Sequence, residues 1–404
     1  MVKSLMNERI NNSDIKIGVI GLGYVGCPLY ILLSKKFTVL GLDIDEKRII
    51  ELKNSEHLYG DCIAGLTNAY EDLSECNFFI VCVPTGVNED KTPDFIPLQN
   101  VCKSLGNILA HGSTVVFEST VFPGATEELC IPLLENSSRL KVNEDFYVGY
   151  SPERINVGDN RHSLDNIAKI ISASNEMTLE LIYKIYSSII SAPIIKASSI
   201  KVAEATKMYE NVQRDVLIAL ANEYSEFCKT EGININEVTE CASSKWNFSK
   251  VHPGLVGGHC IGVDTYYLLN RAQQKSGSLS LIQCARTINE TKTGKVANKI
   301  REIAKGSGAK TILLLGVTFK PDTSDCRNSK AIEILKNLKG EFSVDCYDPL
   351  VDISKVKEEY HLQVLTNQEE LRDKYDLVVR VVNHADFESV NVPCSKFVDL
   401  KELL

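Results

Sequence analysis

A cysteine set among glycines is the first feature that could carry chemistry. Residues 257–264 read Gly-Gly-His-Cys-Ile-Gly-Val-Asp, and the cysteine is Cys260. Two glycines let the backbone approach a ligand closely, and a helix that begins near Cys260 would stabilise its thiolate, a nucleophile. In such a helix Asp264 lies one turn on, where a carboxylate can handle protons but disfavours the thiolate unless a cation compensates. A buried structural thiol is the usual alternative, but the glycines and Asp264 favour the nucleophile.

Three polar side chains follow one another at helical spacing upstream of this cysteine. Asn211 comes four residues after Lys207, and Arg214 comes three residues later still. An ammonium and an amide on one helix face can hold an oxyanion, and a guanidinium can hold a charged ligand. A solvated face is the alternative, but the apolar residues around these three favour a site.

A glycine-rich loop near the N-terminus indicates a dinucleotide site. The segment Gly-Leu-Gly-Tyr-Val-Gly, residues 21–26, follows an apolar strand and opens a helix, and Asp43 ends the next strand. Such a loop brings its backbone close to a pyrophosphate, while the carboxylate accepts from ribose hydroxyls and repels a 2′-phosphate, which favours NAD over NADP. Glycines that merely allow close packing are the alternative. Arg48 is either a phosphate ligand or a solvated helix residue.

Two further segments lie where ligands gather at strand ends. Tyr-Ser-Pro-Glu-Arg, residues 150–154, follows a strand, so Glu153 is either a candidate base or a surface partner of Arg154. Residues 316–322 follow a later strand, and Arg327 comes soon after them. This segment lacks the GxGxxG pattern of dinucleotide-binding loops. The second segment can therefore hold a nucleotide, but by other contacts.

The elements that position these residues alternate between short apolar strands and helices, which predicts doubly wound parallel sheets. In the first half the expected strands are 15–20, 38–42, 77–83, 114–117, 146–149 and 167–171. A long helix follows from Ser199 to about Gly232, apolar over more than one stripe and so expected to be buried between domains. The second alternating part has expected strands at 311–316, 343–347, 377–382 and 396–399, with a helix at 329–338. Within it Arg380 needs a partner, because an unpaired buried guanidinium is costly.

Composition excludes several classes of protein. The 404 residues include 44 Lys and Arg against 53 Asp and Glu, and this net charge of -9 has the wrong sign for a nucleic-acid or anionic-membrane binder. The 13 cysteines form no CxxC pair, which predicts a reducing cytoplasm and no metal site. No apolar run is long enough to span a membrane, and residues 1–14 look like a flexible tail rather than a signal peptide.

Three segments together resemble the UDP-glucose/GDP-mannose dehydrogenase family: PGLVGGHCIGVDTYYL at 253–268, YSPERINVGD at 150–159 and GVTFKPDTSDCRNS at 316–329. PERIN followed by GGHCIGVD resembles the branch that acts on UDP-N-acetylhexosamines, either UDP-N-acetylglucosamine or UDP-N-acetylgalactosamine. The resemblance implies two Rossmann-like doubly wound domains joined by a central helical domain. The expected bounds are 15–198 for NAD binding, 199–300 for the helical part that builds a homodimer, and 301–404 for UDP-sugar binding.

The family's reaction is a four-electron oxidation with two NAD+. The C6 alcohol of the sugar becomes an aldehyde, Cys260 captures it as a thiohemiacetal, and the resulting thioester is hydrolysed to a uronate for surface polysaccharide. UDP-glucose and UDP-N-acetylmannosamine are alternative substrates. A two-electron dehydrogenase, or a nucleotide-sugar sensor without chemistry, is the alternative function.

The resemblance also implies roles for individual residues. Catalytic roles fall to Cys260, Lys207, Asn211, Asp264, Glu153 and Thr120. Cofactor contacts fall to Gly21, Gly23, Tyr24, Val25, Gly26, Asp43, Arg48, Pro84, Thr85, Ser119, Thr120 and Arg327. Substrate contacts fall to Glu153, Arg154, Ile155, Lys207, Asn211, Arg214, His252, Gly254, Gly257, Phe319 and Lys320. Thr265 departs from the family, where close relatives usually have proline, and Lys401 stands in for a substrate arginine of longer relatives.

Overall fold

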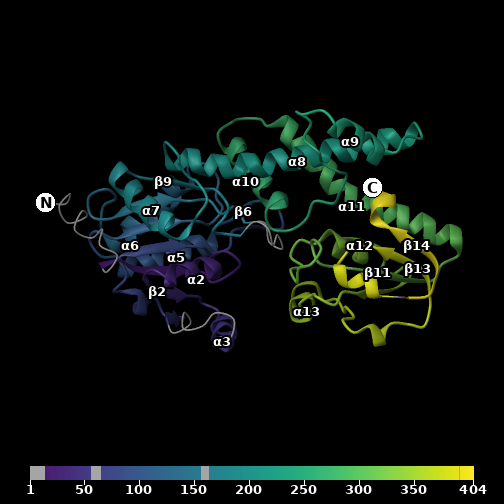
Figure 1. Cartoon of the computed structure of the whole chain (residues 1–404), viewed down its shortest axis with the longest axis horizontal. Coiled ribbons are helices and arrows are strands. Elements are labelled where there is room, and N and C mark those ends of the chain that lie inside the picture. Colours follow the sequence, from purple (N-terminus) through teal and green to yellow (C-terminus); the bar gives the residue numbers. More distant parts are fainter. Residues whose placement is uncertain (1–13, 56–64, 156–162, 391) are drawn as a thin grey trace. The chain divides into compact units, whose positions relative to one another are not determined.

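The computed structural model describes residues 14–55, 65–155, 163–390 and 392–404 (Figure 1). The chain divides between Tyr209 and Glu210 into two compact units, which are described separately. The expected tail thus lies almost wholly outside the described residues.

The first unit is built on an eight-stranded sheet with the order β10-β9-β8-β7-β4-β1-β2-β3. Its strands are β1 (Lys16–Ile20), β2 (Thr38–Leu42), β3 (Leu66–Thr67), β4 (Phe78–Val81), β7 (Thr114–Phe117), β8 (Tyr147–Tyr150), β9 (Lys169–Ala173) and β10 (Ile194–Lys196). The six predicted strands are confirmed, whereas the short edge strands β3 and β10 were not predicted. The expectation of a wholly parallel sheet is wrong at one place, because β9 pairs antiparallel with β8.

Helices cover both faces of this sheet (Figure 1). They are α2 (Gly26–Ser34), α3 (Glu46–Asn54), α5 (Ile96–Ile108), α6 (Ile131–Ser138) and α7 (Glu176–Ile189), with short helical turns at η3 (Tyr70–Leu73) and η4 (Thr126–Cys130) and a small antiparallel ribbon of β5 (Gly86–Val87) and β6 (Pro93–Asp94). Alternate strand residues enter different cores: Ile17 and Ile80 pack in one, Ile20 and Val81 in the other. Burial on both faces explains why these strands read as continuous apolar runs.

The long helix α8 (Ile200–Thr230) is confirmed. Its first turns belong to the first unit, where the fully buried carboxylate of Glu204 accepts from the backbone N–H groups of Gly124 and Thr126. The expectation that this apolar helix is buried is wrong at Leu220 and Phe227, which are 60% and 51% exposed in the single chain.

The second unit joins helices to a four-stranded parallel sheet with the order β12-β11-β13-β14. Its elements are α9 (Ile235–Ser243), α10 (Ile261–Gln274), α11 (Ser280–Ser307), β11 (Thr311–Leu315), α12 (Lys330–Leu338), β12 (Ser343–Tyr347), α13 (Ile353–Tyr360), η5 (Gln368–Glu370), β13 (Tyr375–Arg380), η6 (Ala385–Ser389), β14 (Cys394–Asp399) and α14 (Leu400–Leu403). All four predicted strands are confirmed. Arg380 has its partner, since its Nε donates to Asp399 Oδ2 at 2.7 Å.

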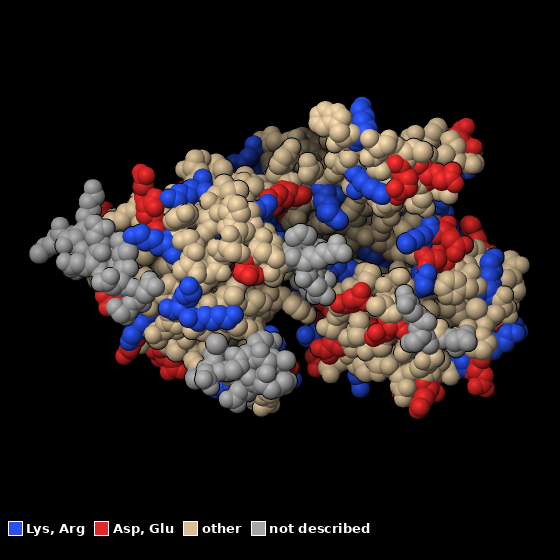
Figure 2. All heavy atoms as spheres, in the orientation of Figure 1, with Lys and Arg blue, Asp and Glu red and all other residues tan. Residues whose placement is uncertain are grey.

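Charged side chains of both signs are interspersed on the viewed face of each unit (Figure 2). Among the described residues, none of the helices combines the length and apolarity that crossing a membrane requires. In the same part of the chain, no group of His, Cys, Asp and Glu side chains is arranged to hold a metal ion.

Candidate active site

The glycine loop of the first unit turns tightly between β1 and α2. A Cβ added to Gly26 would lie 1.8 Å from Gly21 O, so only glycine fits where the helix meets the loop. At Gly23, by contrast, an added Cβ would meet no heavy atom of the described residues within 4 Å. This open position is a surface that a ligand's pyrophosphate can approach, as in dinucleotide-binding loops, and the loop therefore fits NAD. Tyr24 is 44% exposed beside it.

Asp43 and Arg48 both hold the glycine loop. Asp43 Oδ2 accepts from Leu22 N at 2.8 Å, and its Oδ1 accepts from Asp45 N at 3.0 Å. Arg48 Nε donates to Leu22 O at 3.0 Å. Asp43 and Arg48 therefore both bond to the backbone of Leu22. This places a carboxylate directly after β2, where a ribose is expected, and a guanidinium beside the glycine loop.

The loops after β4 and β7 are joined by a hydrogen bond. Ser119 Oγ donates to Val83 O at 2.7 Å, which ties the segment of Ser119 and Thr120 to the segment of Pro84 and Thr85. Both loops follow the carboxyl ends of neighbouring parallel strands, the edge where ligands bind in open α/β sheets.

The segment after β8 is buried rather than solvated. Glu153 is 8% exposed, and its Oε2 has no hydrogen-bond partner among the described residues. The backbone N–H of Ile155 donates to its Oε1. Lys207 Nζ donates to the main-chain oxygen of Glu153 at 2.6 Å, and Arg154 Nη1 donates to Ala168 O at 2.7 Å. A buried carboxylate with one oxygen that accepts no hydrogen bond from the described residues suits a base better than a surface ion pair.

In the second unit, Cys260 is the N-cap residue of α10. Its main-chain oxygen accepts from Asp264 N at 2.9 Å, the first hydrogen bond of the helix. Asp264 is buried, and Asn211 Nδ2 donates to its Oδ2. The predicted helix start is therefore confirmed, and the thiol sits where the helix dipole stabilises an anion.

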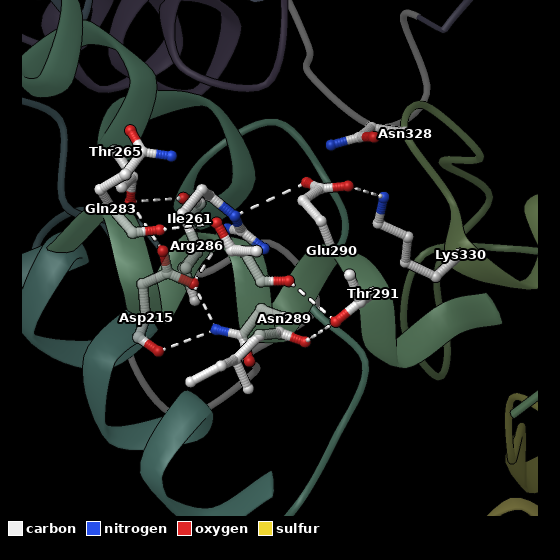
Figure 3. A network of polar contacts seen from close by, with 12 residues as sticks. Asp215, Ile261, Thr265, Gln283, Arg286, Asn289, Glu290, Thr291, Asn328 and Lys330 are labelled. Carbon is white, nitrogen blue, oxygen red and sulfur yellow. Dashed lines mark hydrogen bonds and ion pairs between the residues drawn. The ribbon is translucent and has the colours of Figure 1, made fainter. Parts of the chain in front are cut away.

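A buried polar network supports the first turns of α10 (Figure 3). Thr265 Oγ1 donates to Asp215 Oδ2 at 3.0 Å, and Arg286 Nη1 and Asn289 Nδ2 donate to Asp215 Oδ1 at 2.9 and 2.7 Å. Burial raises the pKa of Asp215, and the guanidinium of Arg286 opposes that rise. Thr265, noted as a departure from the family, thus has a definite partner, a carboxylate on α8.

The loop after β11 carries Phe319, Lys320 and Arg327, which were predicted to contact the nucleotides. Lys320 Nζ lies 5.4 Å from the centre of the Phe319 ring. Arg327 Nη2 donates to Asp325 Oδ2 at 2.6 Å. Asp348 fixes the start of this loop, because its Oδ2 accepts from Val317 N at 2.8 Å. Arg214 and His252 are exposed, and Gly254 N donates to Asn222 Oδ1 at 3.0 Å.

The residues expected to act together fall into two groups. Lys207 and Glu153 meet in the first unit, and Asn211 and Asp264 meet in the second. Sequence reasoning missed several polar residues that are wholly or partly buried, namely Glu118, Lys169, Asp215, Arg286, Asn328 and His384. A charged residue inside an apolar strand run, as at Lys169, is the signal that could have found one of them.

The first unit carries a glycine loop before a helix and a carboxylate, Asp43, directly after the next strand. The second unit carries a cysteine at a helix N-cap. These features define an NAD-dependent oxidoreductase with a candidate thiol nucleophile. Three family models match the chain: the NAD binding domain, central domain and UDP binding domain of the UDP-glucose/GDP-mannose dehydrogenase family, over residues 15–190, 201–291 and 313–403. The chain belongs to this family.

Known relatives cover almost the whole chain. It is 43% identical to a UDP-N-acetyl-D-glucosamine 6-dehydrogenase of Salmonella typhi over 93% of this chain and 92% of that protein. Protein CapL of Staphylococcus aureus is 42% identical over 92% of this chain and 90% of its own. Among solved structures, a UDP-D-ManNAc dehydrogenase of Pyrococcus horikoshii has a TM-score of 0.83 at 30% identity, covering 93% of this chain and 91% of that one.

Proposed function

We propose that this protein oxidises the C6 alcohol of UDP-N-acetylglucosamine to the uronate, with Cys260 as the nucleophile, for surface polysaccharide synthesis. The observation that supports it most is the placement of Cys260 at the N-cap of α10, with Asp264 one turn on. The substrate is supported by relatives of that name at 42–43% identity, against 34% for a UDP-N-acetyl-D-mannosamine dehydrogenase.

The proposed reaction passes through a covalent adduct on Cys260. When bound, NAD+ supplies a hydride acceptor for each of the two oxidations. The alcohol loses a hydride and a proton to give the aldehyde. The Cys260 thiolate adds to the aldehyde carbon, the C=O π bond opens, and its oxygen takes up a proton to form a thiohemiacetal. This adduct loses the second hydride and a proton to become a thioester. Water then adds to the thioester carbon and the thiolate leaves, which releases the carboxylate.

Other side chains are proposed to support these steps. Lys207 and Asn211 stabilise the oxyanion, while Asp264, Glu153 and Thr120 handle water and protons. The remaining cofactor and substrate contacts are proposed at the individual residues that the family resemblance assigns to them. The carboxylate of Glu153 supports its role, because its Oε2 accepts no hydrogen bond from the described residues and so keeps its lone pairs for a proton.

The exposed apolar face of α8 supports a homodimer as the further part of this proposal. Leu220, Tyr224 and Phe227 follow at helical spacing and are 60%, 46% and 51% exposed. A second copy of the chain would bury this face. Leu220→Asp is expected to convert the dimer to monomer in light scattering, whereas Ile353→Asp, at an exposed apolar site on α13, leaves it dimeric. A monomeric wild type would contradict the dimer.

The domain bounds 15–198, 199–300 and 301–404 are proposed on the three matched segments. A cytoplasmic location is proposed because a catalytic thiol must stay reduced, as it does in that compartment.

The test is a panel of UDP-hexoses scored for NADH formed per sugar, with products identified by NMR. Wild type is expected to prefer UDP-N-acetylglucosamine and to form two NADH per sugar. Cys260→Ser is expected to stop at the aldehyde, with about one NADH per sugar. A preference for UDP-glucose or UDP-N-acetylmannosamine would refute the substrate, and full turnover by Cys260→Ser would refute the thioester route.

A further inference from the structure

The loop that carries Cys260 is held to the start of α12 by a pair of hydrogen bonds. Gly258 N donates to Asn328 O at 3.2 Å, and Asn328 Nδ2 donates back to Gly258 O at 2.9 Å. Asn328 thus satisfies both backbone groups of a residue two positions before the thiol. Two bonds to one residue fix the orientation of its peptide planes as well as its distance.

The glycines of this loop allow that close approach. A Cβ on Gly257 would lie 2.6 Å from Asn328 O, and one on Gly258 would lie 2.7 Å from Phe319 Cδ2. Both distances are shorter than real side-chain contacts. The two glycines before the cysteine were first interpreted as leaving room for a ligand. The space where their side chains would lie is instead filled by the loop of residues 317–328.

Asn328 is itself held firmly. Its φ of 51° lies in the left-handed region, which asparagine tolerates better than most residues. Its backbone N–H donates to Tyr360 Oη at 3.1 Å, and that hydroxyl donates to Cys326 O at 3.2 Å. Two residues on, Lys330 is buried and pairs with Glu290 on α11 (Figure 3). The two hydrogen bonds to Gly258 thus come from a residue whose surroundings are tied to α11 through Lys330 and to α13 through Tyr360.

We propose that Asn328 is a positioning residue for Cys260: its amide and carbonyl groups set the backbone of Gly258 and so the placement of the thiol. This inference rests on the proposed function, in which Cys260 is the nucleophile. It separates the two oxidations, because the first needs no thiol, whereas the second requires the Cys260 adduct. A defect at Asn328 should therefore fall on the second step.

The sharpest variant is Asn328→Asp, which keeps the shape and the tolerance for positive φ but replaces the Nδ2 donor by an acceptor facing Gly258 O. The expected result is a second hydride transfer slowed about tenfold in single-turnover experiments, while the first stays within about twofold and KM for the sugar is little changed. The first NADH should appear at nearly the wild-type rate, and aldehyde-level intermediate should accumulate before the second NADH forms. Asn328→Gly, which loses the amide without strain, should show the same asymmetry more weakly.

A second measurement does not depend on turnover. The alkylation rate of Cys260 by iodoacetamide, followed by mass spectrometry, should change severalfold in Asn328→Asp and remain unchanged in Asn337→Asp. Asn337 is an exposed residue of α12, the helix that follows Asn328, so it controls for the added charge. A wild-type rate of the second hydride transfer together with wild-type alkylation in Asn328→Asp would overturn the proposal, as would equal slowing of both steps together with a lower Tm. Two NADH per sugar from Cys260→Ser would instead refute the proposed function, while the alkylation result would still judge the placement of the thiol.

Discussion

Lys169 Nζ lies 2.7 Å from Glu118 Oε2, and the two side chains are 4% and 0% exposed. Tyr186 donates its hydroxyl to the other oxygen of Glu118. Burial alone would lower the pKa of Lys169, but the carboxylates of Glu118 and Glu153 outweigh burial and raise it. Burial raises the pKa of the Glu118 carboxyl as well, and Lys169 and Tyr186 oppose that rise. The pair lies directly after β7 and at the start of β9, next to the segments that carry Ser119 and Glu153.

Lys169→Met should destabilise the protein by about 3–5 kcal/mol, because it leaves the buried carboxylate of Glu118 without its cation. Urea unfolding measures the loss. Adding Glu118→Gln to this variant should recover part of it. The exposed pair of Lys196 and Glu180 provides the control, since Lys196→Met should cost about 1 kcal/mol or less. A similarly small loss for Lys169→Met would show that the buried pair is not needed.

Acid should weaken the second unit through Asp348. Burial raises the pKa of its carboxyl, but the hydrogen bonds from His384 and from Val317 N outweigh burial and lower it below its ordinary value of 3.8. Because the folded pKa is the lower one, this stabilisation is present above pH 3.8 and is lost as the pH falls through the folded value. The pH dependence of the unfolding free energy below that value should be shallower in Asp348→Asn. An identical slope would exclude Asp348 as the titrating group.

The glycine loop should separate cofactor binding from folding. Gly23→Ala adds a methyl group in open space, so Tm should stay near wild type while NAD affinity falls at least about tenfold. Gly26→Ala should instead damage folding, because its methyl group would overlap Gly21 O. Calorimetric titration and thermal unfolding measure the two effects. Wild-type NAD affinity in Gly23→Ala would mean that the cofactor does not approach this position.

Thr265→Val should cost about 1–2 kcal/mol, since it removes one donor from the buried carboxylate of Asp215. Arg286→Met should cost more, about 3–5 kcal/mol, because it removes the only charge that pairs with Asp215 in the described part of the chain. Chemical unfolding of both variants gives the comparison. Equal losses would show that the charge of Arg286 contributes nothing beyond a hydrogen bond.

Local patterns predicted the elements well, because strand runs and helix starts depend on neighbouring residues. The glycine loop, Asp43 at the end of β2 and Cys260 at the start of α10 are all of this kind. The reversal of β9 was not predictable in the same way, since it depends on how a distant segment returns to the sheet.

The pairs that hold the site together come from distant parts of the chain. Glu118 and Lys169 are 51 residues apart, and Gly258 and Asn328 are 70 apart. Their meeting is fixed by strand register and loop packing, which no short pattern encodes. Asn328 in particular looks like an ordinary turn residue until its bond to Gly258 is seen.

The carboxylate of Glu204 ties the second turn of α8 to the backbone at Gly124 and Thr126. Amide protons of residues 204–208 should therefore exchange with deuterium as slowly as those of the neighbouring sheet. The stretch around Leu220 is tied instead within the second unit, where Asn222 Nδ2 donates to Gly254 O and to Asn289 Oδ1. One continuous helix would thus report two different opening free energies along its length.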